Sequence, residues 1–392
     1  MLPRHCNVIK MLSSKKVAIV YDRVNKFGGA ERVLTALHEI FPTAVLYTSV
    51  YEPKNASWAK VFPKVVASFL NKIHFLRDKH ILLGWLMPFV FEQFDFKKYD
   101  IVISVTSESA KGIITTPKTF HYCYLLTPTR YLWSGYDFYL NHPPKVFKLI
   151  PGFKYFAKHI LLYVSIWDRI AANRPDFIVT ISTEVKKRIK QYYNRDSEII
   201  YPPVDLKQKH KVNTHLPKDY FLIHGRFEPY KRLDLVIKTF ATLKKTLVVS
   251  GSGSDFYYFK RLNRFKNIIF IEKPNDDLVC ELYKRAKALI QPQLEDFGIA
   301  SLEAQLFGTP VITYSKGGSN DTVIDGKTGV YFKHQSLRSL KYAIAKFDKI
   351  SFNQRYLSKH AKRFNKARFK RQLQRSLVRA YLSWRRRNEA MA

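Results

Sequence analysis

The sequence is poor in cysteine and in long apolar runs, and each shortage excludes a class of protein. Only three cysteines, Cys6, Cys123 and Cys280, occur in 392 residues, without disulfide or metal-ligand spacing. This usage predicts a protein of the reducing cytosol. A membrane-spanning helix needs about 18 consecutive apolar residues. The apolar stretch Ile81–Phe91 is shorter and is interrupted by Pro88, so we expect no spanning helix.

Acidic residues are also scarce: 31 Asp and Glu stand against 67 Lys and Arg, which leaves a net charge of +36. Such a balance predicts an acidic partner, which could be nucleic acid, an anionic membrane surface or a phosphate-bearing substrate. The hydrophobic content of 46% is ample for large cores. A chain of this length usually forms two domains.

The stretch Leu294–Gly318 organises the rest of the chain. Its pattern predicts a strand end, a tight turn at Gly298 and a helix over Ile299–Leu306. Gly308 is placed to stop that helix, and a second strand follows Pro310.

The same stretch carries two carboxylates in positions that suit a sugar nucleotide. Glu295 lies just before the helix and can accept hydrogen bonds from sugar hydroxyls, while Glu303 lies within the helix and can hold a ribose. The first N–H groups of the helix, from Phe297, Gly298 and Ile299, favour an anion at its amino-terminal end.

A second set of residues predicts a site for phosphate groups. Arg226 ends a predicted strand and Lys231 starts a helix five residues later, so the two cations can converge on a diphosphate. Gly28-Gly29 lies between the first strand and the first helix, where glycine lets a phosphate approach backbone N–H groups. A glycine pair alone is weak evidence for this role.

Taken together, these motifs resemble the retaining glycosyltransferases of family 4, also called glycosyl transferases group 1. The family signature has two glutamates separated by seven residues. The sequence matches it at Glu295, Glu303, Ala304, Gly308, Pro310 and Val311. It also matches the family's glycine loop at Gly28-Gly29-Ala30-Glu31, its Arg and Lys pair, and its segment Thr127–Trp133.

The resemblance implies an α/β protein of two Rossmann-like, doubly wound domains that face each other across a cleft, the GT-B fold. It implies transfer of a hexose from a nucleotide-sugar donor to a glycan or lipid-linked acceptor, with retained configuration. Glu295, Arg226 and Lys231 inherit catalytic roles. Gly28, Gly29, Phe297, Gly298, Ile299 and Glu303 join those three as donor-binding residues. We expect no metal ion and no other cofactor. Mannosyltransferases of polysaccharide assembly are the most similar members, so GDP-mannose is the first guess for the donor and a UDP-sugar the alternative.

Two positions depart from the family pattern. Leu126 stands where a histidine is common near the donor sugar and acceptor, and Ser134 where an aspartate is usual. Because leucine cannot hydrogen-bond a sugar, either another group such as His121 or Glu108 takes part, or that contact is absent. Arg130 is a candidate phosphate contact, with a structural ion pair as the alternative.

The pattern also predicts the domain boundaries. We expect an N-terminal extension over residues 1–15, with Met11 as an alternative start. An acceptor-binding domain over 16–205 and a nucleotide-sugar-binding domain over 206–365 follow. A basic terminal helix over 366–392 would cross back to the first domain, with its apolar stripe as core contact.

Two stretches mix aromatic and basic residues, namely Val61–Phe91, expected to be helical, and Lys145–Leu162. They could be buried helices or a surface that meets an anionic membrane. The second reading predicts a cytoplasmic protein held peripherally on the inner face of the plasma membrane. Two other functions stay open: a basic nucleic-acid-binding protein on the same fold, and a GT-B sugar-nucleotide epimerase. The matched carboxylates and cations favour the transferase, so we do not expect a nucleic-acid partner.

Overall fold

The structure is a computed structural model, and it describes residues 11–12, 14–73, 84–141, 153–212 and 214–391. The chain forms two compact units. Unit 1 comprises residues 1–202 and 369–392, and unit 2 comprises residues 203–368. Most of the expected extension, residues 1–15, lies outside the described residues.

Unit 1 is built on a seven-stranded parallel sheet of order β3-β2-β1-β4-β5-β6-β7. Its strands are β1 (Val17–Tyr21), β2 (Val45–Thr48), β3 (Val65–Ala67), β4 (Ile101–Thr106), β5 (Phe120–Leu125), β6 (Phe177–Thr180) and β7 (Glu198–Ile199). The strand order reverses between β1 and β4, as in a doubly wound fold, and ligands in such folds bind beyond the carboxyl ends of the strands at that point.

Helices connect the strands of unit 1. They are α2 (Gly29–Ile40), α3 (Met87–Glu92), α4 (Tyr136–Asn141), α6 (Phe153–Ala171) and α7 (Thr183–Tyr193), with short 3₁₀ turns η1 (Ser57–Val61), η2 (Phe69–Lys72) and η5 (Ala110–Gly112). The expectation of a helical stretch over Val61–Phe91 holds at α3 and at the turn η2, but it is wrong for Val65–Ala67. Val65–Ala67 is instead the edge strand β3, because its residues pair with β2.

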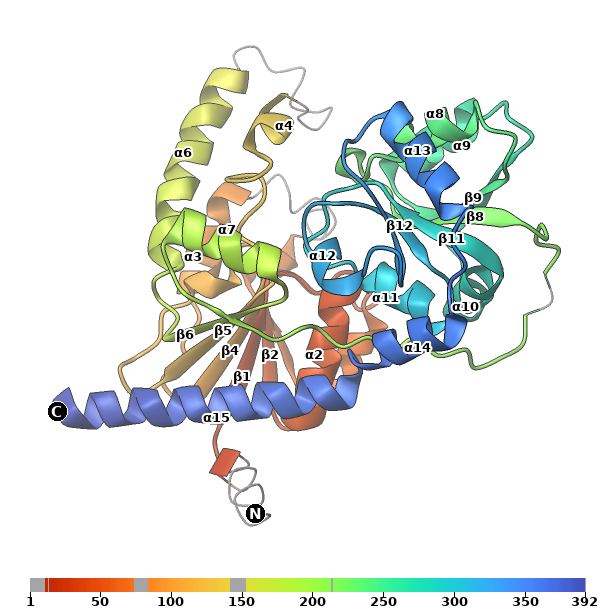
Figure 1. Ribbon diagram of the computed structural model, residues 1–392. Helices are drawn as coiled ribbons and strands as arrows, with labels where there is room; N and C mark the ends of the chain where they lie inside the picture. The colour runs from red at the N-terminus through yellow and green to blue at the C-terminus, as the bar shows by residue number, and fades with distance from the viewer. Residues whose placement is uncertain (1–10, 13, 74–83, 142–152, 213, 392) are drawn as a thin grey trace. The chain divides into compact units, whose positions relative to one another are not determined.

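The long helix α15 (Lys366–Met391) completes unit 1 (Figure 1). Its buried residues include Phe369, Leu373, Leu377, Ala380 and Trp384, which recur at helical spacing. Tyr381 and Trp384 contact Phe120 at the start of β5, and Ser376 accepts a hydrogen bond from Tyr122. The apolar stripe of the terminal helix is therefore part of the core of unit 1.

Unit 2 is built on a six-stranded parallel sheet of order β10-β9-β8-β11-β12-β13. Its strands are β8 (Tyr220–Arg226), β9 (Leu247–Ser252), β10 (Ile268–Glu272), β11 (Ala286–Gln291), β12 (Val311–Tyr314) and β13 (Gly329–Phe332). Alternate residues enter two separate cores: Phe221 and Ile223 of β8 belong to one, and Tyr220 and Leu222 to the other. The sheet is thus covered on both faces.

The two faces of this sheet are covered by the remaining helices. They are η6 (Pro229–Lys231), α8 (Leu233–Phe240), α9 (Ser254–Leu262), α10 (Asp276–Arg285), α11 (Ile299–Leu306), α12 (Ser319–Thr322), α13 (Leu337–Phe347) and α14 (Gln354–Lys362). The predicted helix of the organising stretch is α11, with the predicted bounds. The α/β class expected from the sequence is confirmed.

Candidate functional site

The candidate donor site lies at the carboxyl edge of the unit 2 sheet. Arg226 is the last residue of β8, and Glu295 follows β11, the strand that pairs with β8. Because parallel strands end at one edge of a sheet, the two motifs found far apart in the sequence come to the same edge.

Lys231 and Glu295 form an ion pair across this edge. The Lys231 Nζ lies 2.7 Å from Glu295 Oε1, and the side chains are 21% and 14% exposed. Gln293 donates a second hydrogen bond to the same oxygen. The expected phosphate-binding cation and the expected sugar-binding carboxylate are therefore ion-paired with each other.

Arg226 lies at the same edge of the sheet but has a different environment. Its Nε donates to Glu228 Oε1 at 3.0 Å, and its side chain is 62% exposed. Glu228 also accepts a hydrogen bond from Ser254 at the start of α9. The guanidinium is therefore held at the end of β8 while most of its surface stays in solvent.

Close backbone packing shapes the loop that carries Arg226. A Cβ on Gly251 would lie 1.9 Å from the carbonyl oxygen of Gly225, and Gly251 has a φ of +143°. Only glycine fits at this position, because a side chain would push apart the ends of β8 and β9. This constraint fixes the backbone next to the two cations.

The loop before α11 is anchored at both sides. Glu295 pairs with Gly317 in a parallel bridge, and its carbonyl accepts from Gly318 N at 2.8 Å. Gly298 has a φ of +95° and serves as the N-cap, and Phe297 is buried against Phe364. The amino-terminal N–H groups of α11, including that of Ile299, extend the site next to Glu295.

Glu303 is less accessible than its expected ribose contact requires. It is 5% exposed, and its Oε2 accepts a hydrogen bond from Tyr283 OH at 3.3 Å. The ring of Tyr283 in turn contacts His224 of β8. A ribose contact by Glu303 stays a prediction.

In unit 1, the glycine loop leads into α2. Gly28 is the N-cap of α2 in an extended conformation, and Gly29 is the first residue of the helix. Glu31, in the first turn, accepts a hydrogen bond from Tyr21 OH at 2.7 Å. Burial raises the pKa of the Glu31 carboxyl. This glutamate therefore supports the loop from inside the domain.

A buried aspartate that the sequence analysis did not single out ties together the ends of β1 and β4. Asp22 follows β1 and accepts hydrogen bonds from Thr106 Oγ1 at 2.8 Å and from Ser107 N at 2.7 Å. The backbone N–H groups of residues 108–110 also donate to it. Burial raises the pKa of the Asp22 carboxyl. Its position directly after the first strand was the only signal in the sequence.

A second buried network holds the segment Thr127–Trp133. Asp168 of α6 accepts hydrogen bonds from Lys111 at 2.5 Å, Thr129 at 2.8 Å, Trp133 at 2.8 Å and Tyr193 at 2.6 Å. The Lys111 and Asp168 side chains are each 1% exposed. The Thr127–Trp133 segment is therefore clamped by one carboxylate, which sequence analysis could not identify.

The two groups considered in place of the family histidine lie at opposite ends of the unit 1 sheet. Glu108 follows β4 at the carboxyl edge and forms an ion pair with Arg23. His121 lies at the amino end of β5, fully buried, with its Nε2 2.8 Å from Ser104 Oγ. Burial lowers the pKa of His121 to about 3. The structure thus removes His121 from the candidate acceptor contacts. Arg130 lies in the loop after β5, beyond the carboxyl edge.

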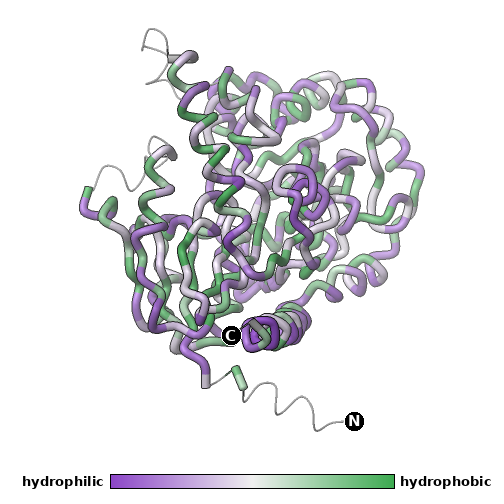
Figure 2. Tube along the Cα trace, turned by 90° about the vertical axis from the view of Figure 1, so that its left-hand side faces the viewer, coloured by the Kyte–Doolittle hydropathy of each residue, from purple (hydrophilic) through white to green (hydrophobic). Residues whose placement is uncertain are grey.

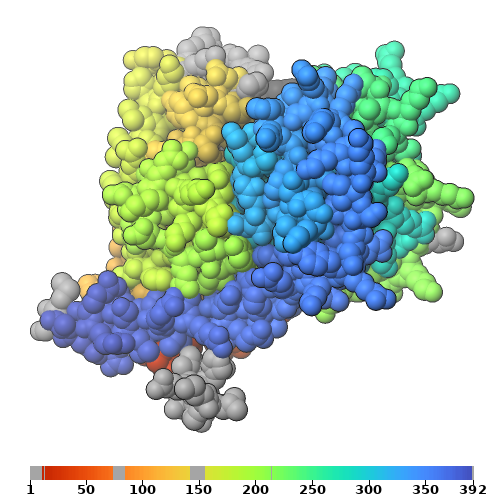
Figure 3. Space-filling view, in the orientation of Figure 1, coloured from red at the N-terminus to blue at the C-terminus, as the bar shows by residue number. Residues whose placement is uncertain are grey.

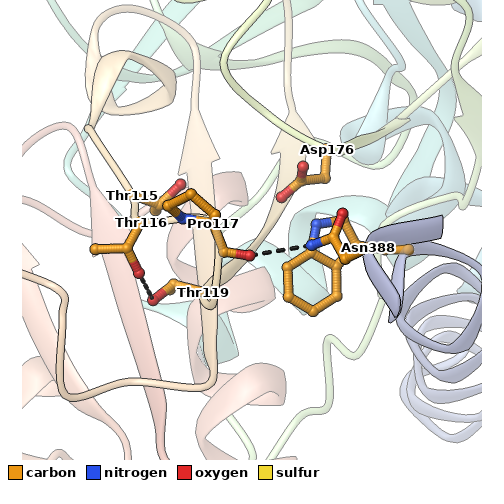
Figure 4. A pocket seen from close by; sticks show the side chains of 7 residues that line it. Thr115, Thr116, Pro117, Thr119, Asp176 and Asn388 are labelled. Carbon is orange, nitrogen blue, oxygen red and sulfur yellow. Dashed lines mark hydrogen bonds between the residues drawn. The ribbon is translucent and has the colours of Figure 1, made fainter. Parts of the chain in front are cut away.

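A separate pocket of about 270 Å³ lies near the amino end of β5 (Figure 4). Thr115, Thr116, Pro117, Thr119, Asp176, Trp384 and Asn388 line it. None of the predicted site residues is among them, so this pocket belongs to the contact of α15 with the sheet.

Comparison with known proteins gives the family of unit 2. Residues 205–369 match the family described as glycosyl transferases group 1. The α-1,3/1,6-mannosyltransferase ALG2 of Debaryomyces hansenii is 24% identical in an alignment that covers 80% of this chain and 77% of ALG2. In three other relatives the matched segment covers 48%, 64% and 41% of the relative's length. The chain thus matches about half the length of these relatives.

Solved structures show the fold of the whole chain. A sucrose-phosphate synthase from Thermosynechococcus elongatus has a TM-score of 0.67 at 15% identity, with 94% of this chain and all (100%) of that chain covered. Anabaena HepE in complex with UDP-glucose has a TM-score of 0.62 at 15% identity, with coverage of 92% and 99%. The chain therefore has the GT-B fold of two Rossmann-like units, and its residues 205–369 are a glycosyl transferases group 1 domain.

Proposed function

We propose that this protein is a retaining glycosyltransferase that moves a hexose from a nucleoside diphosphate sugar to a hydroxyl of a glycan or lipid-linked acceptor. The observation that carries the proposal is the Lys231–Glu295 pair, held at the amino end of α11 beside Arg226. The group 1 match and the similarity to a mannosyltransferase support the reaction class. Mannose remains the first choice of sugar, with GDP-mannose or a UDP-sugar as donor.

The ion pair suggests how the donor would be bound. A diphosphate that approaches this edge offers Lys231 a stronger anionic partner than Glu295. When Lys231 turns to the diphosphate, the Glu295 carboxylate becomes available to the hydroxyl groups of the sugar. Binding of the donor would thus separate the two residues into their two roles.

In transfer, negative charge develops on the leaving diphosphate. Lys231, Arg226 and the first N–H groups of α11 would stabilise that charge, which is electrostatic catalysis by groups already in place. The leaving phosphate would accept the proton of the attacking hydroxyl. These steps use only groups of the protein and the donor, so we propose that transfer requires no metal ion.

Calorimetry with UDP and GDP tests the roles of the pair. We expect Lys231→Ala and Arg226→Ala each to weaken binding of the preferred nucleotide, because a charge-assisted contact contributes about 1.5–3 kcal/mol, roughly tenfold to a hundredfold. Glu295→Gln should leave nucleotide binding unchanged or tighter, because Lys231 no longer has to leave a carboxylate, but it should slow sugar transfer.

Lys245→Ala is the matched control. Lys245 also forms an ion pair in unit 2, at 2.9 Å from Asp348, but it lies before β9 at the opposite edge of the sheet. Wild-type nucleotide affinity in both Lys231→Ala and Arg226→Ala would remove the assignment. Turnover of the nucleotide sugar without any acceptor product would favour the epimerase.

We extend the proposal to the acceptor and its location. The strongly basic composition supports a phosphate-bearing acceptor such as a lipid-linked glycan, which the protein would meet from the cytoplasmic side of a membrane.

A further inference from the structure

The helix α6 has an apolar outer face. Large hydrophobic side chains on it are exposed to solvent, namely Tyr155 (68%), Phe156 (63%), Leu162 (59%), Tyr163 (48%), Ile166 (55%) and Ile170 (55%). Their spacing of three, four and seven residues places them on one side of the helix. We call these six residues the outer face of α6. Figure 3 shows atoms of α6 at the surface of unit 1, and in Figure 2 hydrophobic segments recur along it.

The opposite side of α6 is buried in unit 1. Val164, Trp167 and Ala171 are at most 8% exposed, and Asp168 is bound by Lys111. A helix at the surface of a water-soluble domain normally turns polar residues outward, whereas a helix that is apolar all round is covered on every side. The described residues of unit 1 leave this face uncovered, and it therefore indicates a further contact.

The charges around the outer face are basic. Among the described residues of α6 whose side chains are exposed, the ionisable ones are Lys158, His159 and Arg169, and the single acid of the helix, Asp168, is buried. Arg169 lies over the ring of Trp133 at 4.8 Å, which holds it beside the helix. An anionic partner would find complementary charge at Lys158 and at Arg169.

The carboxyl end of α15 adds more positive charge near the end of α6. Asp176 follows α6 and lines the same cavity as Trp384 and Asn388 of α15 (Figure 4). Arg386 and Arg387, between those two, are exposed. Figure 2 shows the end of α15 on the same side of unit 1 as α6.

From these observations we infer that the outer face of α6 lies in the headgroup region of an anionic lipid bilayer, with Lys158, Arg169 and the arginines at the end of α15 against lipid phosphates. An amphipathic contact of this kind buries apolar side chains among the headgroups and places cations beside them. A second copy of the chain would instead bring like charges together. In the described part of the chain, no helix is long and apolar enough to cross a membrane, so the helix would lie along the surface.

The inference deepens the proposal of a lipid-linked acceptor and rests on it only for the position of that acceptor. Attachment itself needs neither donor nor acceptor. It can therefore be measured by vesicle sedimentation without nucleotide, while nucleotide binding is measured separately by calorimetry. Failure of one measurement leaves the other unaffected.

The experiment uses the full chain with vesicles of phosphatidylcholine alone or mixed with phosphatidylglycerol. We expect binding to the anionic vesicles only, and a decrease when salt rises from about 0.1 M to about 1 M, because the Debye length falls from about 10 Å to about 3 Å. The double substitution Ile166→Ser/Ile170→Ser should weaken binding about tenfold or more, because both half-exposed side chains lose their burial. The matched control is Leu262→Ser/Tyr342→Ser, two exposed apolar residues of unit 2.

A second pair of variants tests the charges. Arg386→Gln/Arg387→Gln should weaken binding about tenfold or more, since each basic residue near an anionic surface adds about a fivefold factor. Lys333→Gln/Arg338→Gln, with the same charge change on exposed residues of unit 2, should leave binding near wild type. Equal binding to neutral and anionic vesicles would overturn the inference. It would also be overturned if neither the Ile166/Ile170 nor the Arg386/Arg387 variant changed binding. A dimer seen by light scattering that Ile166→Ser/Ile170→Ser dissociates would show that a second copy covers the face.

Discussion

Replacement of Asp168 by asparagine should strongly destabilise unit 1. The carboxylate accepts four hydrogen bonds, and its closest donor is the ammonium group of Lys111, with both side chains 1% exposed. Asparagine keeps the shape but removes the charge, so Lys111 would remain buried without a counter-ion. Breaking a buried ion pair in this way costs about 3–5 kcal/mol.

Urea unfolding followed by tryptophan fluorescence measures this loss in unit 1 alone. All five tryptophans of the chain, at positions 58, 85, 133, 167 and 384, belong to unit 1. The signal therefore stays separate from unit 2, which matters because a chain of two units need not unfold in one step. Trp133, which donates to Asp168, reports directly on the altered site.

Two further variants decide whether the buried charge is the cause. Asp196→Asn breaks an exposed ion pair in which the Lys190 side chain is 58% exposed and the Asp196 side chain 90%. This substitution should lower the free energy of unfolding by less than about 1 kcal/mol. Adding Lys111→Met to Asp168→Asn should restore about 2 kcal/mol or more, because it removes the unpaired ammonium. The reasoning is refuted if Asp168→Asn costs less than about 1 kcal/mol or if the double variant is no more stable.

Two more predictions concern stability. His121 has a folded-state pKa of about 3, below its value in the unfolded chain. Its contribution to the free energy of unfolding is therefore complete above about pH 6.5 and is lost as the pH falls toward 3. Between these pH values the free energy of unfolding, measured with urea, should fall by about 1.4 kcal/mol per pH unit more in the wild type than in His121→Gln. The same pH dependence of stability in both proteins would contradict the burial of a neutral imidazole. Gly251→Ala should destabilise unit 2 by about 2 kcal/mol or more in excess of the loss caused by Gly326→Ala, with unfolding followed by circular dichroism. Both glycines have a positive φ, but only Gly251 has no room for a Cβ. Equal losses in the two variants would show that the close approach to Gly225 is relieved at little cost.

The parts of the fold that sequence analysis predicts best are those fixed by local rules. Gly298, Gly308 and Pro310 bound α11 by their backbone preferences, so its range follows from the sequence. The strand Val17–Tyr21 is likewise an uninterrupted apolar run, which local hydrophobicity alone favours as a buried strand. In contrast, β3 has only three residues, and it is a strand because it pairs with β2. Local propensity cannot show such a pairing.

The candidate site divides in the same way. The types and spacing of Arg226, Lys231 and Glu295 indicate their chemistry, but the ion pair between the last two joins residues 64 positions apart. Lys111 and Asp168 are separated by 57 positions, and nothing in the sequence marks either as buried. His121 is misplaced for an acceptor contact for a related reason: its residue type suits such a contact, but only the sheet shows that it lies buried at the amino end of β5.

The path of α15 has a consequence for how the protein is made. Unit 1 consists of residues 1–202 and 369–392, so its core is incomplete until residues 369–392 have been synthesised. Trp384 then packs against Phe120, Phe369 packs against Tyr124, and Ser376 accepts a hydrogen bond from Tyr122. Unit 2 is continuous and can close while the ribosome is still adding α15. During translation the order of folding is thus the reverse of the order of the sequence, and the amino-terminal unit must keep an apolar surface open until its final helix emerges.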